Sequence, residues 1–126
     1  MRPTGSTTSA VRLRSQRMGE PMLCAVHGEI DISNVAELED GLAEGFRRGP
    51  SVVADLSEVH FFASAGVRAL VDAIETQPRS HVLGVVTGPG VDTILRICGL
   101  AAATVCRPDL DSANRACMAE LRARRT

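Results

Sequence analysis

The residue with the clearest potential for chemistry is Ser64, which lies where a predicted strand gives way to a predicted helix. Residues 52–56 are almost all apolar and β-prone, as in a strand covered on both faces. Beyond the serine, Val67, Leu70 and Ile74 recur at helical spacing. The first turn of a helix exposes unpaired N–H groups and the positive end of the helix dipole, and both stabilise a phosphate. The pattern therefore allows two interpretations: a phosphorylation switch at Ser64, or a serine that only caps the helix.

Other catalytic chemistry finds little support around Ser64. A serine hydrolase carries the motif G-x-S-x-G, and here Phe62 stands where the first glycine belongs. Gly88-Pro89-Gly90 follows a predicted strand and opens a helix, like a phosphate-binding loop, but it lacks the Gly-Lys-Ser/Thr ending and is more typical of a turn. We therefore predict that the chain is not an enzyme. The alternative to this prediction is a small serine hydrolase or a nucleotide-binding protein.

The cysteines do not have the spacing of a metal site. Cys24, Cys98, Cys106 and Cys117 include no C-x-x-C pair, and the chain has only three histidines. We expect small core residues of a protein kept in a reducing compartment, with a redox pair of Cys98 and Cys106 as the alternative. No metal or other cofactor is predicted.

Length, charge and hydropathy limit the partners. A chain of 126 residues is expected to form one domain. Its net charge of −1 gives no broad field for a polyanion, and three Phe without Tyr or Trp give few surfaces on which bases could stack. No apolar stretch approaches the roughly 20 residues of a membrane span, and the first residues lack the apolar centre of a signal peptide. We predict a cytoplasmic protein that contacts neither nucleic acid nor a membrane.

The elements that position Ser64 alternate along the chain. Residues 11–14 and 22–26 are predicted to form an antiparallel hairpin, and residues 28–34 a loop before the first helix. Ser33 or Asn34 is predicted to cap that helix, with Glu37 completing a capping box. The further expected strands are 52–56, 82–86 and 104–106, each followed by a helix.

This order predicts a single α/β domain: a mixed, mostly parallel β-sheet with an N-terminal β-hairpin and about four helices. Its expected limits are residues 10–122. A flexible tail is predicted at residues 1–9 and a basic tail at residues 123–126.

Three segments together resemble the STAS domain family, which includes bacterial anti-sigma factor antagonists and the cytoplasmic ends of sulphate transporters. Residues 28–31, Gly-Glu-Ile-Asp, match the family's Gly-Glu-Leu-Asp, and residues 52–62 match its central strand and following loop. Residues 63–66, Ala-Ser-Ala-Gly, match Asp-Ser-Ser-Gly, in which the first serine accepts phosphate. A weaker match covers residues 91–100, and together the matches span roughly residues 10–120.

The resemblance implies an anti-sigma factor antagonist. The unphosphorylated chain would bind an anti-sigma factor that is itself a serine kinase, and so would free a sigma factor for transcription. Phosphorylation of Ser64 would end the binding, and a phosphatase would restore it. Ala63 and Ala65 depart from the motif, and with Ala63 the carboxylate beside the acceptor is lost. The alternative is a STAS scaffold or adaptor without phosphorylation, in a stressosome-like or lipid-transport complex.

The expected partner surface combines the loop at Asp31, the loop at Phe61 and Phe62, and the exposed face of the helix that Ser64 opens. That face comprises Ser64, Ala65, Arg68 and Asp72. Either one phenylalanine is exposed as an anchor or both are buried. Arg68, one helical turn after Ser64, is expected either to pair with the phosphorylated serine or to be solvated. The oligomeric state is left open between a monomer and a weak dimer.

Overall fold

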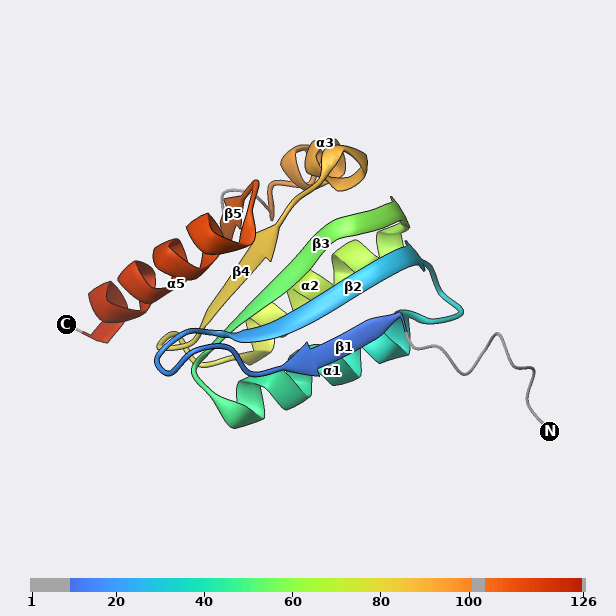
Figure 1. Ribbon diagram of the computed structural model, residues 1–126. Helices are drawn as coiled ribbons and strands as arrows, with labels where there is room; N and C mark the ends of the chain where they lie inside the picture. The colour runs from blue at the N-terminus through green and yellow to red at the C-terminus, as the bar shows by residue number, and fades with distance from the viewer. Residues whose placement is uncertain (1–9, 101–103, 126) are drawn as a thin grey trace.

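Five strands form the sheet of this protein, for which a computed structural model describes residues 10–100 and 104–125. They are β1 (Val11–Arg14), β2 (Met22–Ile30), β3 (Ser51–Phe62), β4 (Val82–Val86) and β5 (Val105–Arg107), and they lie side by side in chain order (Figure 1). β1 runs antiparallel to β2, whereas β2 to β5 run parallel. The predicted hairpin and the mostly parallel sheet are thus confirmed.

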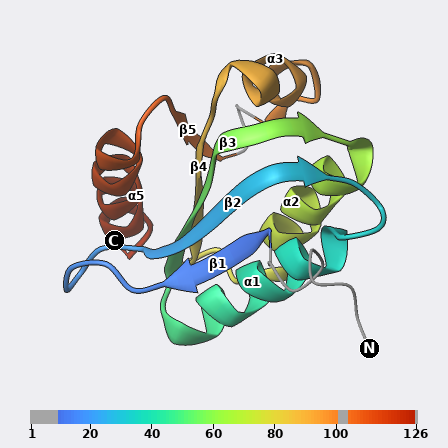
Figure 2. The same cartoon turned by 45° about the vertical axis from the view of Figure 1, so that its right-hand side comes forward.

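Helices cover the two faces of the sheet unequally. α1 (Val35–Arg48) and α2 (Ser64–Thr76) lie against one face, α5 (Leu110–Arg125) lies against the other, and α3 (Pro89–Ile97) lies beyond the end of β4 (Figures 1 and 2). The larger core is mostly aliphatic and lies under α1, α2 and α3, with Ile30, Leu38, Leu42, Leu56, Leu70, Val91 and Leu95 buried. A smaller core lies under α5 and contains Leu23, Val53, Val82, Val86, Ala113, Cys117 and Leu121.

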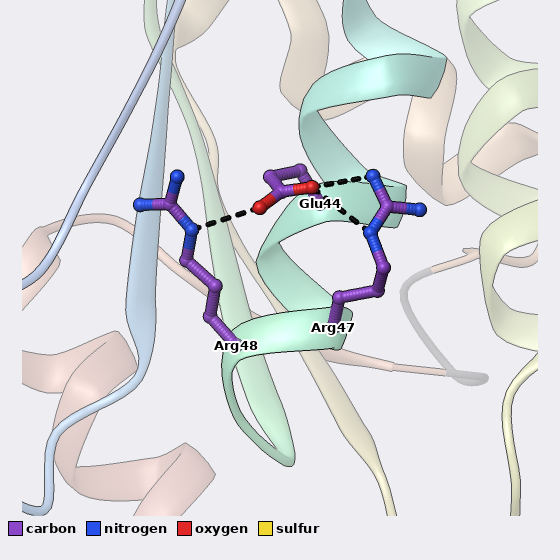
Figure 3. A network of polar contacts seen from close by, with 3 residues as sticks. All are labelled: Glu44, Arg47 and Arg48. Carbon is purple, nitrogen blue, oxygen red and sulfur yellow. Dashed lines mark hydrogen bonds and ion pairs between the residues drawn. The ribbon is translucent and has the colours of Figure 1, made fainter.

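The amphipathic pattern of residues 35–48 explains why they form α1: the apolar side chains lie along one side of the helix and the polar ones elsewhere. Val35, Leu38, Leu42 and Phe46 are buried along one side of the helix. On the other side Glu44 accepts hydrogen bonds of 2.9 Å from the Nε atoms of both Arg47 and Arg48 (Figure 3). These bonds lower the pKa of Glu44. Exposed ion pairs contribute little, so the buried stripe provides most of the stability of α1.

The start of α1 corrects the prediction of a capping box. Asn34 occupies the N-cap position, but its side chain makes no cap hydrogen bond. Its Oδ1 instead accepts from the Asp31 N–H at 2.9 Å, and its Nδ2 donates to the Glu29 carbonyl at 2.8 Å. The Glu37 carboxylate accepts from the Ala10 N–H at 2.9 Å rather than from the helix start. The preceding loop thus holds the Asn34 side chain, and Ala10, which is distant in the chain, donates to that of Glu37.

Two strands are longer than predicted. β2 includes residues 28–30 and β3 includes residues 57–62, both of which were expected to be loops. The register between these strands shifts twice, between Ala25 and His27 and between Gly28 and Glu29. Such bulges break the alternation of apolar and polar residues, which explains why the sequence pattern indicated loops.

The C-terminal basic run is helical as far as Arg125, so residues 123–125 belong to α5 rather than to a separate tail. The Arg124 guanidinium donates to the His81 carbonyl at 2.7 Å and pairs with Glu120 at 2.9 Å. This arginine therefore ties the end of α5 to the segment that precedes β4.

Gly84 in β4 has no room for a side chain. A Cβ there would overlap the Cys117 sulfur and lie 3.3 Å from a methyl group of Val53. We expect Gly84→Ala to lower the free energy of unfolding by about 3 kcal/mol, because both neighbours are buried. Adding Cys117→Ala removes the sulfur that the new methyl group would overlap. The double variant should therefore lose less stability than the sum of the two single losses.

Urea denaturation measures these differences, with Gly49→Ala as the matched control. Gly49 has extended backbone (φ −170°) and nothing within 4 Å of an added Cβ. Its replacement should change stability by less than about 0.5 kcal/mol. Equal stability of Gly84→Ala and Gly49→Ala would contradict the packing described here.

Candidate functional site

The fold brings the Asp31 loop and the start of α2 to the same edge of the sheet. Ile30, the last residue of β2, is opposite Phe62, the last residue of β3. The Ala63 N–H donates to the Ile30 carbonyl at 2.9 Å, so the strand ends are still joined where the chain leaves the sheet. The next residues along the chain are Asp31 on one side and Ser64 on the other. Two segments that the sequence analysis singled out separately thus become neighbours.

Ser64 is the first residue of α2 and is exposed. The N-cap position belongs to Ala63, which has extended backbone angles (φ −72°, ψ 168°) and no side chain that could cap. Within the part of the chain that the structure describes, the Ser64 hydroxyl makes no hydrogen bond. The interpretation of Ser64 as a capping residue is therefore wrong. The hydroxyl lies accessible at the positive end of the helix dipole.

The Asp31 loop is held by its own hydrogen bonds. Asp31 Oδ1 accepts from the Ser33 N–H at 2.9 Å and from the Ser33 hydroxyl at 2.5 Å. These bonds lower the pKa of Asp31, with the Ser33 side chain as the largest cause. The turn leaves Ile32 82 % exposed at its tip. Sequence reasoning missed Ile32, although an isoleucine between two polar residues in a predicted loop was a usable signal.

The two consecutive phenylalanines point in different directions. Phe61 is 54 % exposed, whereas Phe62 is 3 % exposed. The Phe62 ring packs so closely on α2 that a Cβ at Gly66 would lie 2.7 Å from it. The structure therefore shows one exposed phenylalanine rather than two buried rings. Phe62, which we expected on the partner surface, is a core residue instead because successive positions of a strand face opposite sides.

On the exposed face of α2, Arg68 pairs with Asp72 rather than with Ser64. Arg68 Nε lies 3.0 Å from Asp72 Oδ1, and the two side chains are 69 % and 46 % exposed. A cation four residues before an anion is the weaker orientation for a helix pair, and such exposed pairs contribute little. The contact therefore offers little resistance to a new partner for Arg68. Ala65, on the same helix, is partly buried against the core.

The glycines of the Gly-Pro-Gly segment are explained by packing. A Cβ at Gly88 would lie 3.1 Å from the Ser57 carbonyl oxygen, and one at Gly90 would lie 3.3 Å from that of Val59. α3 begins between them, at Pro89. Close approach to the backbone of β3 therefore accounts for both glycines without a phosphate.

The cysteines are free, and burial protects two of them. Cys24 and Cys117 are buried, and the loss of solvation raises the pKa of each thiol to about 12. Burial also raises the pKa of Cys106, which opposes formation of a reactive thiolate.

Among the described residues, no group of three or more His, Cys, Asp or Glu side chains is placed to hold a metal ion. In the same ranges, no helix is both long enough and apolar enough to cross a membrane.

Comparison with known families decides what this chain is. Residues 13–113 match the STAS domain family. The chain belongs to the STAS domain family. A comparison with curated proteins found no match.

Solved structures agree with this assignment. The STAS domain is similar to an anti-sigma factor antagonist from Mycobacterium paratuberculosis, with 28% identity, a TM-score of 0.77, and coverage of 85% of this chain and 92% of the other. An anti-sigma-factor antagonist (STAS) domain protein from Planctomyces limnophilus matches with 14% identity and a TM-score of 0.73, over 86% and 98% of the two chains. The anti-sigma factor antagonist SpoIIAA in its unphosphorylated form matches with 12% identity and a TM-score of 0.59, over 81% and 91%. The latter two establish the shared fold.

Proposed function

We propose that this STAS domain is an anti-sigma factor antagonist that phosphorylation of Ser64 switches off. The observation that carries the proposal is the exposed Ser64 hydroxyl at the first position of α2, beside the Asp31 loop. The similarity to the antagonist from Mycobacterium paratuberculosis supports it. In this proposal the unphosphorylated domain binds an anti-sigma factor serine kinase in the cytoplasm and so permits transcription by a sigma factor. A phosphatase returns the phosphorylated form to the active one.

The proposed docking surface lies around the ends of β2 and β3 and along α2. Ile32 and Phe61 are its apolar anchors, since both are large apolar side chains with most of their surface exposed. The polar part comprises Asp31, Ser64, Arg68 and Asp72, together with the partly buried Ala65 on α2.

A phosphate at Ser64 would change this surface without changing the fold. It adds about −1.5 to −2 charges, which the first turn of α2 tolerates. Arg68, one turn along the helix, forms an exposed pair with Asp72 and exchanges that partner for the phosphate. A kinase packed against the same surface would bury a charge that it does not compensate, which is costly. Binding is therefore lost while the free phosphorylated domain is stabilised.

The test uses the purified ATPase-type anti-sigma factors of the source organism. Each is mixed with the domain and ATP, and binding and phosphorylation are measured. One of them should bind the wild-type domain and phosphorylate Ser64, as mapped by mass spectrometry. Ser64→Asp should weaken binding by about a hundredfold or more, whereas Ser64→Ala should bind and accept no phosphate. Ser80→Asp adds the same charge to an exposed serine in the α2–β4 connection and should bind normally. Equal binding by Ser64→Asp and wild type would refute the switch.

Ala63 favours one other function, a STAS scaffold or adaptor that is never phosphorylated, in a stressosome-like or lipid-transport complex. Where the family pattern has an aspartate, the N-cap of α2 here has only a methyl group. A carboxylate that could orient the hydroxyl or a metal-bound nucleotide is thus missing at that position. Stable binding without phosphate on any serine in the kinase assay would support the scaffold.

A further inference from the structure

α1 and α2 lie side by side over one face of the sheet (Figures 1 and 2), and a groove of about 200 Å³ remains between them. Small residues leave this space, because Ala43 of α1 and Ala69 of α2 both line the groove. Its apolar lining includes three side chains that are almost fully buried, those of Leu42, Phe46 and Ala69. The groove therefore has an apolar floor that is continuous with the core of the domain.

Two carboxylates line the same groove, one from each helix. Asp72 of α2 has an exposed pair with Arg68 at 3.0 Å. Glu39 of α1 makes neither an ion pair nor a hydrogen bond with any residue in the ranges 10–100 and 104–125. By contrast, Glu44 farther along α1 accepts from two arginines (Figure 3). Among the described residues that line the groove there is no lysine, arginine or histidine, so its own charge is negative.

An apolar floor beside carboxylates matches the side chain of an arginine from another protein. Its methylene groups can lie on the floor while the guanidinium at its end reaches Glu39 and Asp72. Liquid water takes about 30 Å³ per molecule, so the groove has room for about six or seven heavy atoms, the size of an arginine side chain. A guanidinium is weakly hydrated and donates from several edges, so it suits two carboxylates on opposite helices better than the compact ammonium of lysine does.

We propose that the anti-sigma factor inserts an arginine side chain into the groove between α1 and α2 when it binds this STAS domain. The inference rests on the function proposed above, and it adds α1 to the docking surface, with Glu39 as the main acceptor because Asp72 already has a partner. The arginine anchors the bound kinase through charge and apolar contact at once.

The groove is within reach of a partner seated on Ser64. Ser64, Arg68 and Asp72 follow one another at four-residue spacing on α2, which places Asp72 about 12 Å along the helix from Ser64. A protein interface of ordinary size covers about 800 Å² on each partner, which is roughly 30 Å across. Asp72 belongs both to the docking surface and to the groove, so the two are continuous.

Two variants on α1 test the groove, with binding of the anti-sigma factor measured by titration calorimetry. Glu39→Gln removes the unpaired carboxylate and should weaken binding about tenfold or more. Asp40→Asn is its matched control, since Asp40 is the next residue, is exposed and does not line the groove, and it should bind as the wild type does. Ala43→Leu occupies the groove and should also weaken binding about tenfold. Ala119→Leu makes the same change at an exposed position of α5 and should bind normally.

A double-mutant cycle identifies the arginine on the partner. Alanine at one surface arginine of the anti-sigma factor should weaken binding of the wild-type domain, but should weaken binding of Glu39→Gln little further, because the contact is already lost. Thermal unfolding checks that each variant is folded, as expected for changes at exposed positions.

The outcomes separate this inference from the proposed function. Wild-type binding by Glu39→Gln, while Ser64→Asp stays defective, would overturn the arginine contact and leave the switch intact. Weak binding by Ala43→Leu together with full binding by Glu39→Gln would mean that the groove takes an apolar side chain, which also contradicts an arginine. A wild-type domain that binds no anti-sigma factor would overturn the proposed function and this inference with it.

Discussion

Alanine at Phe62 is expected to destabilise the fold, whereas alanine at Phe61 is expected to impair binding. Phe62 is buried against Gly66, so Phe62→Ala should lower the free energy of unfolding by about 3–5 kcal/mol. Phe61 is 54 % exposed, so Phe61→Ala should change stability by less than about 0.5 kcal/mol. Because Phe61 is an anchor of the docking surface, Phe61→Ala should nevertheless weaken anti-sigma factor binding by about thirtyfold or more. Urea denaturation and titration calorimetry measure the two quantities.

This pair of variants provides its own control, because the substitutions are identical and adjacent. Comparable destabilisation by both would mean that the orientation of the β3 end is wrong. Full stability together with unchanged binding in Phe61→Ala would remove Phe61 from the docking surface and leave the fold intact. Only one combined result supports both assignments. Phe61→Ala must lose binding without losing stability, and Phe62→Ala must lose stability.

Stability is expected to fall steeply in alkaline solution because of two buried thiols. The chain contains neither lysine nor tyrosine, and its arginines keep their charge, so cysteines dominate titration above pH 9. In the unfolded chain a thiol loses its proton near pH 9, whereas Cys24 and Cys117 hold theirs to about pH 12 in the fold. A group whose pKa is higher in the folded state stabilises the fold below its unfolded pKa, and that contribution is lost as pH rises. Above pH 9 the two thiols together should reduce the free energy of unfolding by about 2.7 kcal/mol per pH unit.

Denaturation curves between pH 8 and pH 11 test this slope. Cys24→Ala should remove about half of it, and Cys24→Ala/Cys117→Ala should remove most of it, even though both variants lose some stability at neutral pH. Cys98→Ala is the matched control, since Cys98 is exposed. A double variant with the wild-type slope would show that other groups cause the alkaline loss.

Local signals in the sequence determined the order of the elements and several of their ends. Alternating apolar runs and turn residues predicted the hairpin, the parallel strands and each helix that follows a strand. Asp109 accepts from the Ser112 N–H at 2.8 Å at the start of α5, and Gly99 has a left-handed φ of +77° after α3. Both were predictable because helix ends depend on a few adjacent residues.

Tertiary structure alone decided what the site looks like. Whether Phe61 or Phe62 faces solvent depends on bulges in the β2–β3 pairing, and a shift of one residue would exchange their faces. Ser64 is free of a capping role because Ala63 joins the end of β2 and takes the N-cap position. Glu39 and Asp72 line one groove because α1 and α2 pack side by side, which the spacing of neighbours along the sequence does not encode. The sequence by itself thus determined which elements form, and packing between distant segments determined which of their side chains are available to partners.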